Sequence, residues 1–364
     1  MPLVLLAAGG TGGHLFAAEA LAEALGRRGI AVALATDHRA ERYGKTFPAR
    51  DIYVLASATV RGRNPLSLAR TAAMLGIGTM QGLRLLARTL PSAAVGFGGY
   101  PTIPPVLAAT LRKIPTVIHE QNAVMGRANR FLAPRVNAIA TSFDGVLDRE
   151  PKLNAKATRT GNPVRPAVIA AAATPYAAPE TTGPIRLVVF GGSQGARIMA
   201  DIVPPAVEKL ARDLQARLVV VQQAREEDLA RVTDVYGRAK VAAEVAPFFV
   251  DLPGRIASSH LVVARSGAST VAELAAIGRP AILVPLPHAL DQDQSANAGV
   301  LERAGGAMRL PQADFTPDRL AAEISALASA PQKLVAMAAA ARSQGGIDAA
   351  ERLADLVLRV AAMA

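Results

Sequence analysis

Two glycine-rich segments stand out as places where the chain could bind an anion. They are Gly9–His14 and Gly191–Arg197, and each lies between an aliphatic run and a stretch with helical periodicity. Such a turn lets main-chain N–H groups approach a phosphate, and the following helix adds a favourable dipole. Neither segment has the G-x-G-x-x-G spacing of dinucleotide folds. We therefore expect at least one of them to bind a phosphate or pyrophosphate; the alternative is a tight turn that needs glycine only for its dihedral angles.

Several polar residues of the first half lie at or near the ends of strand-like runs, and two of them could transfer a proton. His14 begins a helical stretch, where it could act as a general base or only hydrogen-bond the main chain. The run His119–Asn122 contains Glu120 as a second candidate base, whereas Asn122 could instead cap a helix. Tyr100 follows two glycines and could donate a hydrogen bond or stack on a substrate, unless it is a partly buried turn residue. We expect these residues at a sheet edge that opens on a cleft.

The second half offers groups suited to a sugar nucleotide. In Arg265–Glu273 a strand-like run leads into a helix, where Ser269 and Thr270 could cap and free N–H groups could hold a phosphate. Glu273 could accept the hydroxyl protons of a ribose, or could only complement the helix dipole. The polar run Asp291–Asn297 suits recognition of sugar hydroxyls, or could form the start of a helix.

The elements that must position these residues are short apolar runs that alternate with helical patterns. The runs lack polar alternation, as expected for parallel strands that helices cover on both faces. Each half opens with strand, glycine turn and helix, which predicts an α/β fold of two Rossmann-like, doubly wound parallel-sheet domains that face a cleft. The expected strands are Leu3–Ala8, Ile30–Ala35, Ala93–Phe97, Pro115–His119 and Val136–Thr141, then Ile185–Phe190, Arg217–Val221, Val241–Val245, Leu261–Ala264 and Ala281–Val284.

A looser stretch rich in Ala, Pro and Thr surrounds Gly161–Pro166, and we place the domain boundary there. The expected domains are residues 1–162 and 163–344. Residues 345–364 should form a helix that crosses back onto the first domain, because Ile347–Met363 carries one apolar stripe. Arg165 lies beside the boundary, where it could reach a diphosphate.

Composition narrows the class of protein. The 364 residues are 51% hydrophobic and 19% charged, which excludes intrinsic disorder. There is no cysteine, so no disulfide and no thiolate site can form, and with five scattered histidines we expect no metal. A net charge of +11 favours phosphate ligands, polyanions or an anionic membrane surface. Met1–Ala8 is too short for a signal peptide and Thr71–Leu83 too short for a membrane span, so we expect a soluble or peripheral protein.

Taken together, these motifs resemble the MurG family over essentially the whole chain. That family consists of the UDP-N-acetylglucosamine–N-acetylmuramyl-(pentapeptide) pyrophosphoryl-undecaprenol N-acetylglucosamine transferases of peptidoglycan synthesis. The resemblance implies a GT-B fold, and transfer of GlcNAc from UDP-GlcNAc to the MurNAc C4 hydroxyl of lipid I, with inversion and without a cofactor. The motifs occur in family order: Gly9–His14, Gly98–Tyr100, His119–Asn122, Gly161–Arg165, Gly191–Arg197, Arg265–Glu273 and Asp291–Asn297.

The resemblance also implies roles for single residues. The resemblance leaves the base open; from the residues themselves we expect His14 in that role, with Glu120 as the second candidate. The substrate-binding positions are Thr11, Gly12, Gly13, Tyr100 and Asn122 toward the donor sugar and acceptor, Arg165 and Ser193 at the diphosphate, Phe249 at uracil through its main chain, Ala268, Ser269, Thr270, Val271 and Glu273 at phosphate and ribose, and Gln294 at GlcNAc. The spacing to Asn297 favours Gln294 over Asp293 for that last contact. Ala17 replaces a proline that is frequent in the family.

Because lipid I lies in a membrane, the resemblance implies a peripheral protein on the cytoplasmic face of the bacterial inner membrane. We expect the apolar surface around residues 75–85 to dock there, with basic residues beside it; a buried amphipathic helix is the alternative. Cell-wall or division proteins are possible partners. The apolar residues are Leu75, Ile77, Met80, Leu83 and Leu85, and the basic ones are Arg70, Arg84, Arg88, Arg112 and Lys113.

Two other functions compete with this one. A UDP-GlcNAc 2-epimerase, or a glycosyltransferase with another acceptor, would share the donor site and differ only near Tyr100 and His119–Asn122. A nucleic-acid-binding module would suit the positive charge, but the low aromatic content, the spread of charge along the chain and the lack of a binding motif argue against it.

Overall fold

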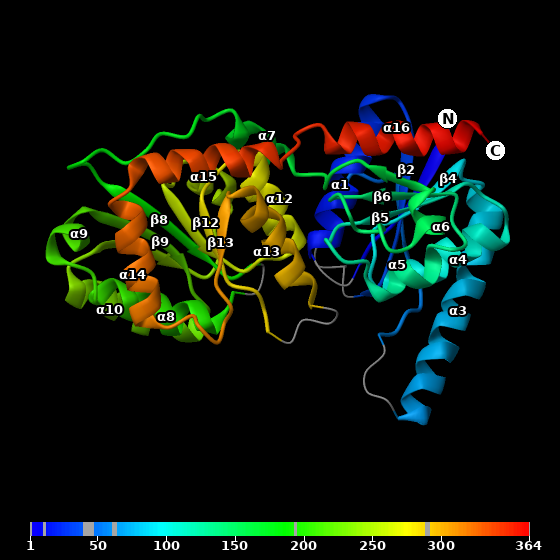
Figure 1. The fold of residues 1–364 in the computed structure, drawn as a ribbon. Coiled ribbons are helices and arrows are strands. Elements are labelled where there is room, and N and C mark those ends of the chain that lie inside the picture. The colour runs from blue at the N-terminus through cyan, green and yellow to red at the C-terminus, as the bar shows by residue number, and fades with distance from the viewer. Residues whose placement is uncertain are drawn as a thin grey trace. The chain divides into compact units, whose positions relative to one another are not determined.

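The computed structural model describes residues 2–9, 12–38, 47–59, 64–192, 195–287 and 292–363 (Figure 1). The chain divides into two compact units, each with its own core. The first contains Met1–Arg165 together with Asp348–Ala364, and the second contains Pro166–Ile347.

The first unit is a parallel sheet with helices on both faces (Figure 1). Its seven strands lie in the order β3-β2-β1-β4-β5-β6-β7. The elements are β1 Leu3–Ala7, α1 Gly12–Arg27, β2 Ala31–Thr36, β3 Asp51–Val54, α3 Pro65–Thr89, β4 Ala93–Gly96, η2 Tyr100–Thr102, α4 Ile103–Leu111, β5 Thr116–Glu120, α5 Arg127–Leu132, β6 Ala138–Thr141, α6 Pro151–Asn154, β7 Ala157–Arg159 and α16 Ala349–Ala362.

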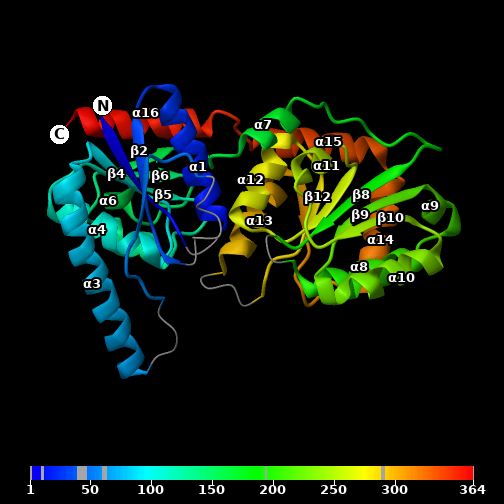
Figure 2. The same ribbon diagram turned by 180° about the vertical axis from the view of Figure 1, so that it is seen from behind.

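The second unit repeats this plan with six parallel strands in the order β10-β9-β8-β11-β12-β13. Helices α8, α10 and α14 pack together over one face of the sheet, and α7, α11 and α12 form a second group over the other face (Figure 2). The elements are α7 Pro166–Ala172, β8 Ile185–Phe190, α8 Arg197–Glu208, α9 Arg212–Arg217, β9 Leu218–Gln223, η3 Glu226–Asp228, α10 Leu229–Ala239, β10 Ala242–Ala246, α11 Leu252–Ala257, β11 Leu261–Ala264, α12 Ala268–Ile277, β12 Ala281–Leu283, α13 Asp293–Ala304, β13 Ala307–Arg309, α14 Pro317–Ala328 and α15 Pro331–Ser343.

Burial on both faces explains why the central strands have no polar alternation. In β1, Val4 and Leu6 belong to the core beneath α1 and α16, whereas Leu3 and Leu5 belong to the core beneath α3 and α4. All five residues of the strand are buried. A strand in this position can use aliphatic residues at every step, as the sequence predicted.

The prediction of two doubly wound parallel-sheet domains is confirmed, but three strands were missed. They are β3, β7 and β13, and each is the last or outermost strand of its sheet. Their sequences are DIYV, ATR and AMR, which are short and carry polar residues because one side of each strand has no neighbour. An edge strand of this kind lacks the apolar run on which the prediction depended.

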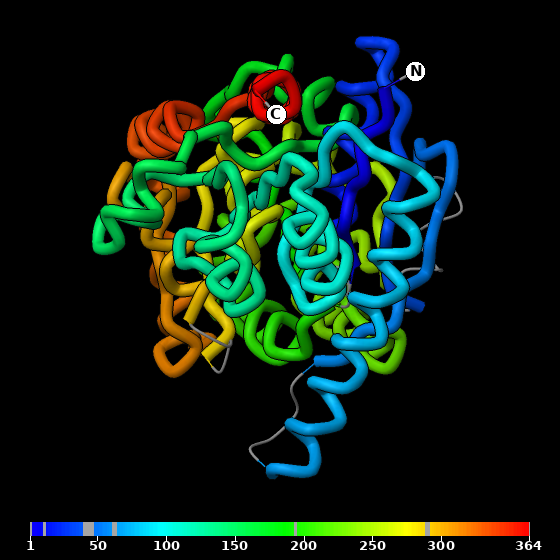
Figure 3. The backbone as a smooth tube through the Cα atoms, turned by 90° about the vertical axis from the view of Figure 1, so that its right-hand side faces the viewer, coloured from blue at the N-terminus to red at the C-terminus, as the bar shows by residue number. Residues whose placement is uncertain are grey.

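Helix α3 is a single long helix whose C-terminal half packs against α4. Glycines make this contact close: a Cβ atom on Gly78 would lie 3.0 Å from Cβ of Pro104, and one on Gly82 would lie 3.0 Å from Cβ of Ala108. The N-terminal part extends beyond the rest of the unit (Figure 3). Leu85 is buried in the core between α3 and the sheet, so its expected place on an exposed apolar surface was wrong.

The last helix of the chain, α16, completes the core of the first unit. Leu353, Leu356 and Val357 are buried beside residues of α1. At the end of α1, Arg27 and Arg28 form ion pairs of 2.6 Å with Glu351. The apolar stripe seen in the sequence is therefore the surface by which α16 packs on this unit.

Candidate functional site

Sheet topology brings the predicted motifs of each unit to one edge. In the first unit the strand order reverses between β1 and β4, and in the second between β8 and β11. Parallel strands present all their carboxyl ends at the same edge, and ligands of open α/β sheets bind where the order reverses. The glycine turns follow β1 and β8, so each turn lies at such a point.

The imidazole of His14 lies against the first glycine turn. Its Nδ1 is 3.2 Å from the main-chain oxygen of Gly9. A carbonyl oxygen only accepts, so Nδ1 carries the proton and the lone pair lies on Nε2. Burial lowers the pKa of His14, while the bond to Gly9 acts in the opposite direction. At neutral pH the ring is therefore uncharged, as a general base requires.

The turn after β4 packs on this imidazole. A Cβ atom on Gly98 would lie 3.5 Å from Nε2 of His14, and one on Gly99 would lie 3.3 Å from its Cε1. Both glycines have positive φ angles, 89° and 74°, that other residues rarely adopt. Tyr100 follows at the start of η2, partly buried. It lines an apolar groove of about 610 Å³ between α3 and α4.

The carboxylate of Glu120 is buried and held by four hydrogen bonds. Oε1 accepts from the main-chain N–H of Asn122 at 2.9 Å and from its Nδ2 at 3.3 Å. Oε2 accepts from the main-chain N–H of Gly126 at 2.9 Å and from Nδ2 of Asn129 at 2.8 Å. Burial raises the pKa of Glu120, and these donors oppose that shift. With both oxygens occupied, the arrangement favours a structural role for Glu120 over that of the base.

Asn122 does not cap a helix, because α5 begins only at Arg127 and its cap is Gly126. Instead, Asn122 sits in the loop that Glu120 holds. Gln121 ties this loop to the first glycine turn by donating from Nε2 to the main-chain oxygen of Gly13, 3.3 Å away. Contacts thus connect the segments that follow β1, β4 and β5; among them Gly12 is buried and Gly13 is partly accessible.

His119 has a structural role behind these segments. It is fully buried, and its Nε2 donates to the Gly161 carbonyl oxygen at 2.9 Å. Burial lowers its pKa to about 4, so the ring stays neutral. Arg165 also belongs to the first unit, and its guanidinium carbon lies 4.6 Å from the ring centre of Phe16, in the second turn of α1. Stacking there holds the cation beside the helix that follows the glycine turn.

In the second unit, Gln223 connects the glycine turn to the loop after β10. Its Oε1 accepts from the main-chain N–H of Gly191 at 3.1 Å, and its Nε2 donates to the carbonyl oxygen of Pro247, also at 3.1 Å. Gly192 and Gly195 have φ angles of 92° and 67°. A Cβ atom on Gly195 would lie 3.2 Å from the Arg225 side chain, so this turn is close to the loop after β9.

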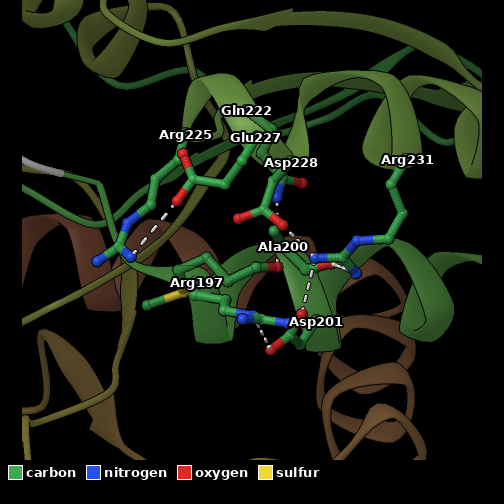
Figure 4. A network of polar contacts seen from close by, with 9 residues as sticks. Arg197, Ala200, Asp201, Gln222, Arg225, Glu227, Asp228 and Arg231 are labelled. Atoms are coloured by element: carbon green, nitrogen blue, oxygen red, sulfur yellow. Dashed lines mark hydrogen bonds and ion pairs between the residues drawn. The ribbon is translucent and has the colours of Figure 1, made fainter.

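Charged side chains join the helix after this turn to the helix after β9 (Figure 4). Arg231 donates to Asp201 at 2.7 Å and to Asp228 at 2.6 Å. Arg197 lies 3.7 Å from Asp201, and Arg225 lies 3.8 Å from Glu227. The network fixes the start of α8 relative to α10.

Helix α12 begins at Ala268, and its cap is Gly267, which offers no side-chain bond. Ser269 and Thr270 therefore do not cap it, contrary to one alternative from the sequence. Together with Ala268 they are partly accessible at the helix start, where main-chain N–H groups can meet an anion. Glu273 is largely buried one turn later.

Val271 differs from its neighbours in the same motif. Its side chain is fully buried, and its main-chain N–H donates to Gly267 at 3.0 Å. Neither group faces solvent, which argues against direct contact with a ligand and for a role in packing.

The first two turns of α13 are tied to the turn before α12. Ser266 donates its hydroxyl to the carbonyl oxygen of Gln294 at 2.8 Å, and Asn297 donates to the carbonyl oxygen of Ser266 at 3.2 Å. The side chain of Gln294 accepts from the main-chain N–H of Leu286 at 3.1 Å. Gln294 thus lies in the first turn of α13, next to the start of α12.

The remaining predicted site residues are Thr11, Ser193 and Phe249. Thr11 and Ser193 lie outside the described residues. Phe249 is described and its side chain is mostly buried, so only its main chain remains for a ligand. In the part of the chain that the structure describes, no three His, Asp or Glu side chains gather as a metal site. No single described helix is long and apolar enough to cross a membrane, although the bent pair α14 and α15 passes that test jointly.

The sequence and fold match known glycosyltransferases. The N-terminal domain of glycosyltransferase family 28 matches residues 4–141, and the C-terminal domain of that family matches residues 186–353. A relative from Rhodopseudomonas palustris (strain BisB18) is 65% identical over 360 residues, which are 99% of this chain and 96% of the relative. It is named UDP-N-acetylglucosamine–N-acetylmuramyl-(pentapeptide) pyrophosphoryl-undecaprenol N-acetylglucosamine transferase.

Solved structures agree with this relationship. The crystal structure of Acinetobacter baumannii MurG superposes with a TM-score of 0.81 at 28% identity, covering 99% of this chain and 100% of that one. A UDP-GlcNAc 2-epimerase from Neisseria meningitidis reaches a TM-score of 0.69 over 99% of this chain and all of its own, at only 15% identity, so it shares the fold alone. The fold is GT-B, and the chain belongs to the MurG family of N-acetylglucosamine transferases within glycosyltransferase family 28.

Proposed function

We propose that this chain transfers GlcNAc from UDP-GlcNAc to the C4 hydroxyl of the MurNAc sugar of undecaprenyl-pyrophosphoryl-MurNAc-pentapeptide (lipid I), giving lipid II in peptidoglycan synthesis. The observation that carries the proposal is the 65% identity over nearly the whole chain to a transferase of that name. The transfer inverts the anomeric carbon, because the acceptor hydroxyl displaces UDP in one step.

In this reaction the first unit receives the acceptor. His14 removes the hydroxyl proton through Nε2, since Nδ1 is engaged with Gly9. Tyr100 and Asn122 border the acceptor sugar, and Thr11, Gly12 and Gly13 border it from the glycine turn. Glu120 holds the loop that carries Asn122.

The second unit receives UDP-GlcNAc. Ala268, Ser269 and Thr270 present the start of α12 to a phosphate, and Glu273 accepts the ribose hydroxyls. Ser193 stabilises the negative charge that develops on the departing diphosphate without a metal, and Arg165 is the cation that the family resemblance assigns to the same group. Gln294 contacts GlcNAc, and the main chain of Phe249 contacts uracil.

The acceptor lies in a membrane, and α3 carries the surface that fits one. Ile77 and Met80 are 52% and 54% exposed, and Leu75 and Leu83 line the groove with Tyr100. No acidic residue occurs between Asp51 and Glu120. The five expected basic residues are exposed around this surface: Arg70, Arg84, Arg88, Arg112 and Lys113. Peripheral attachment to the anionic cytoplasmic leaflet follows from an apolar surface with cations beside it.

The deciding experiment is transfer of labelled GlcNAc from UDP-GlcNAc to a lipid I analogue. We expect a labelled disaccharide lipid, and free UDP in equal amount. A parallel reaction without acceptor should leave the sugar nucleotide unchanged. Conversion of the sugar nucleotide without acceptor would indicate an epimerase instead, and absence of both products would overturn the proposal.

A further inference from the structure

Arg255, on the short helix α11, joins three positions around the loop that follows β10. Its Nη1 and Nη2 donate to the two carboxylate oxygens of Glu244 at 2.5 and 2.9 Å, and its Nε donates to Asp251 at 2.8 Å. The guanidinium carbon also lies 4.4 Å from the ring centre of Phe249. Glu244 belongs to β10, so one side chain connects the strand, the middle of the loop and its end.

The loop itself has little else to hold it on this side. Phe248 and Val250 are 62% and 85% exposed, and of the three consecutive apolar residues only Phe249 is buried. Two exposed apolar side chains contribute little burial to fix the main chain. The guanidinium group of Arg255 is planar and makes two parallel bonds to Glu244. It therefore fixes both the distance between the two side chains and their relative orientation.

The opposite side of the loop is tied to the glycine turn. Gln223 bonds both Gly191 and the carbonyl oxygen of Pro247. The loop therefore lies at the carboxyl edge of the sheet with the turn expected at the diphosphate, held by Gln223 on one side and Arg255 on the other. One side chain, Gln223, thus joins this loop to the turn that we expect at the diphosphate of the donor.

We propose that Arg255 is a positioning residue for the donor: it holds residues 247–251 in the shape that lets the main chain of Phe249 read the uracil base. The inference rests on the proposed function, because it needs UDP-GlcNAc as the donor. Arg255 contacts neither the donor nor the acceptor in this role. Main-chain N–H and C=O groups discriminate uracil from cytosine only when they stay in place, since the two bases differ by one carbonyl and one amino group.

The test compares Arg255→Met with the parent protein, using calorimetry for UDP and CDP and steady-state kinetics with a lipid I analogue. We expect the Kd of UDP and the KM of UDP-GlcNAc to rise about five- to tenfold. The KM of the acceptor should stay the same, kcat should change less than twofold, and the preference for UDP over CDP should shrink. Arg255→Lys, which keeps the charge but loses the fork, should fall between the two proteins.

Arg319→Met is the matched control, because Arg319 is an exposed arginine of the same unit that pairs with Glu323 four residues on. It should leave every one of these constants unchanged. The positioning role is wrong if Arg255→Met keeps the parent Kd for UDP and the parent preference for UDP over CDP. It is also wrong if the variant has a lower melting temperature together with a lower kcat and weaker binding of both donor and acceptor. If the parent itself binds no UDP, the proposed function fails, and that result is separate.

Discussion

His14 donates the proton of Nδ1 to the main-chain oxygen of Gly9, 3.2 Å away, and this bond places the lone pair of the neutral ring on Nε2. The same glycine segment that was expected to bind an anion also holds the imidazole in one tautomer. When Nδ1 of a neutral imidazole carries the proton and donates it to a hydrogen bond, the lone pair lies on Nε2, which is then the nitrogen that can accept a proton.

Replacement of His14 by alanine should lower kcat about a hundredfold or more, because general base catalysis contributes at least that much. The affinity for UDP, measured by calorimetry, should stay the same, because the proposed nucleotide contacts come from other elements. Unchanged turnover would remove His14 from the mechanism.

The pH profile provides a second test of His14. Burial lowers its pKa, so the ring remains an unprotonated base at a more acidic pH than an ordinary histidine, whose pKa is about 6.5. The acidic limb of kcat/KM should therefore fall below that value. A limb above it would point to another base.

Glu120→Gln should destabilise the first unit rather than only slow catalysis. Each carboxylate oxygen of Glu120 accepts hydrogen bonds from two N–H donors. In the variant, the amide NH2 of glutamine would replace one of these oxygens and would face two donors without an acceptor. Buried groups that lose their hydrogen-bond partner in this way lower the free energy of unfolding by about 2 kcal/mol. Thermal unfolding would show this as a lower melting temperature. A variant with the parent's melting temperature and greatly reduced turnover would instead restore Glu120 as a candidate base.

A buried arginine of the second unit, Arg279, donates its hydrogen bonds to main-chain carbonyl oxygens. Arg279 donates to the carbonyl oxygens of Thr174 and Pro175 before β8, of Ala257 on α11, and of Ile277 and Gly278 at the end of α12. Arg279→Met would leave these oxygens without their donor and should reduce the free energy of unfolding by about 3 kcal/mol. Chemical denaturation measures this.

Exposed Arg319 again offers a control for Arg279. Arg319→Met should change the free energy of unfolding by no more than about 0.5 kcal/mol, as is usual for surface positions. Equal effects of the two substitutions would show that the carbonyl cluster contributes nothing specific.

Membrane attachment through α3 should depend on its cations. Each basic residue near an anionic surface contributes about 1 kcal/mol, so the double variant Arg84→Gln, Arg88→Gln should bind phosphatidylglycerol vesicles about thirtyfold more weakly. Sedimentation with these vesicles, at low and high salt, checks the effect. The same two changes at Arg238 and Arg319 should have none, and binding by the parent that is absent or insensitive to salt would count against this surface.

The sequence alone was sufficient for the alternation of strands and helices, the two glycine turns and the order of the family motifs. Strands such as β1 and β8 carry their own signal, because a strand buried on both faces is apolar along its buried length; β1 is apolar throughout, and β8 is apolar except at the exposed Arg186. The edge strands β3, β7 and β13 have no such apolar run. They are identified as strands only by their pairing with the neighbouring strands of the sheet.

Tertiary structure decided what the individual residues of each motif do. Glu120 and His14 are both titratable groups in predicted site motifs, but only the folded chain shows that four donors occupy Glu120 and that Nδ1 of His14 bonds the main chain of Gly9. Leu85 and Met80 both belong to the apolar stretch of α3 that was expected on the surface, but packing buries Leu85 and leaves Met80 exposed. The link from Arg255 to Glu244 and Phe249 depends on how β10 returns to α11. Periodicity and turn residues act over a few neighbouring positions and can be read along the chain, whereas hydrogen-bond partners and burial depend on segments that only the crossover connections of the sheet bring together.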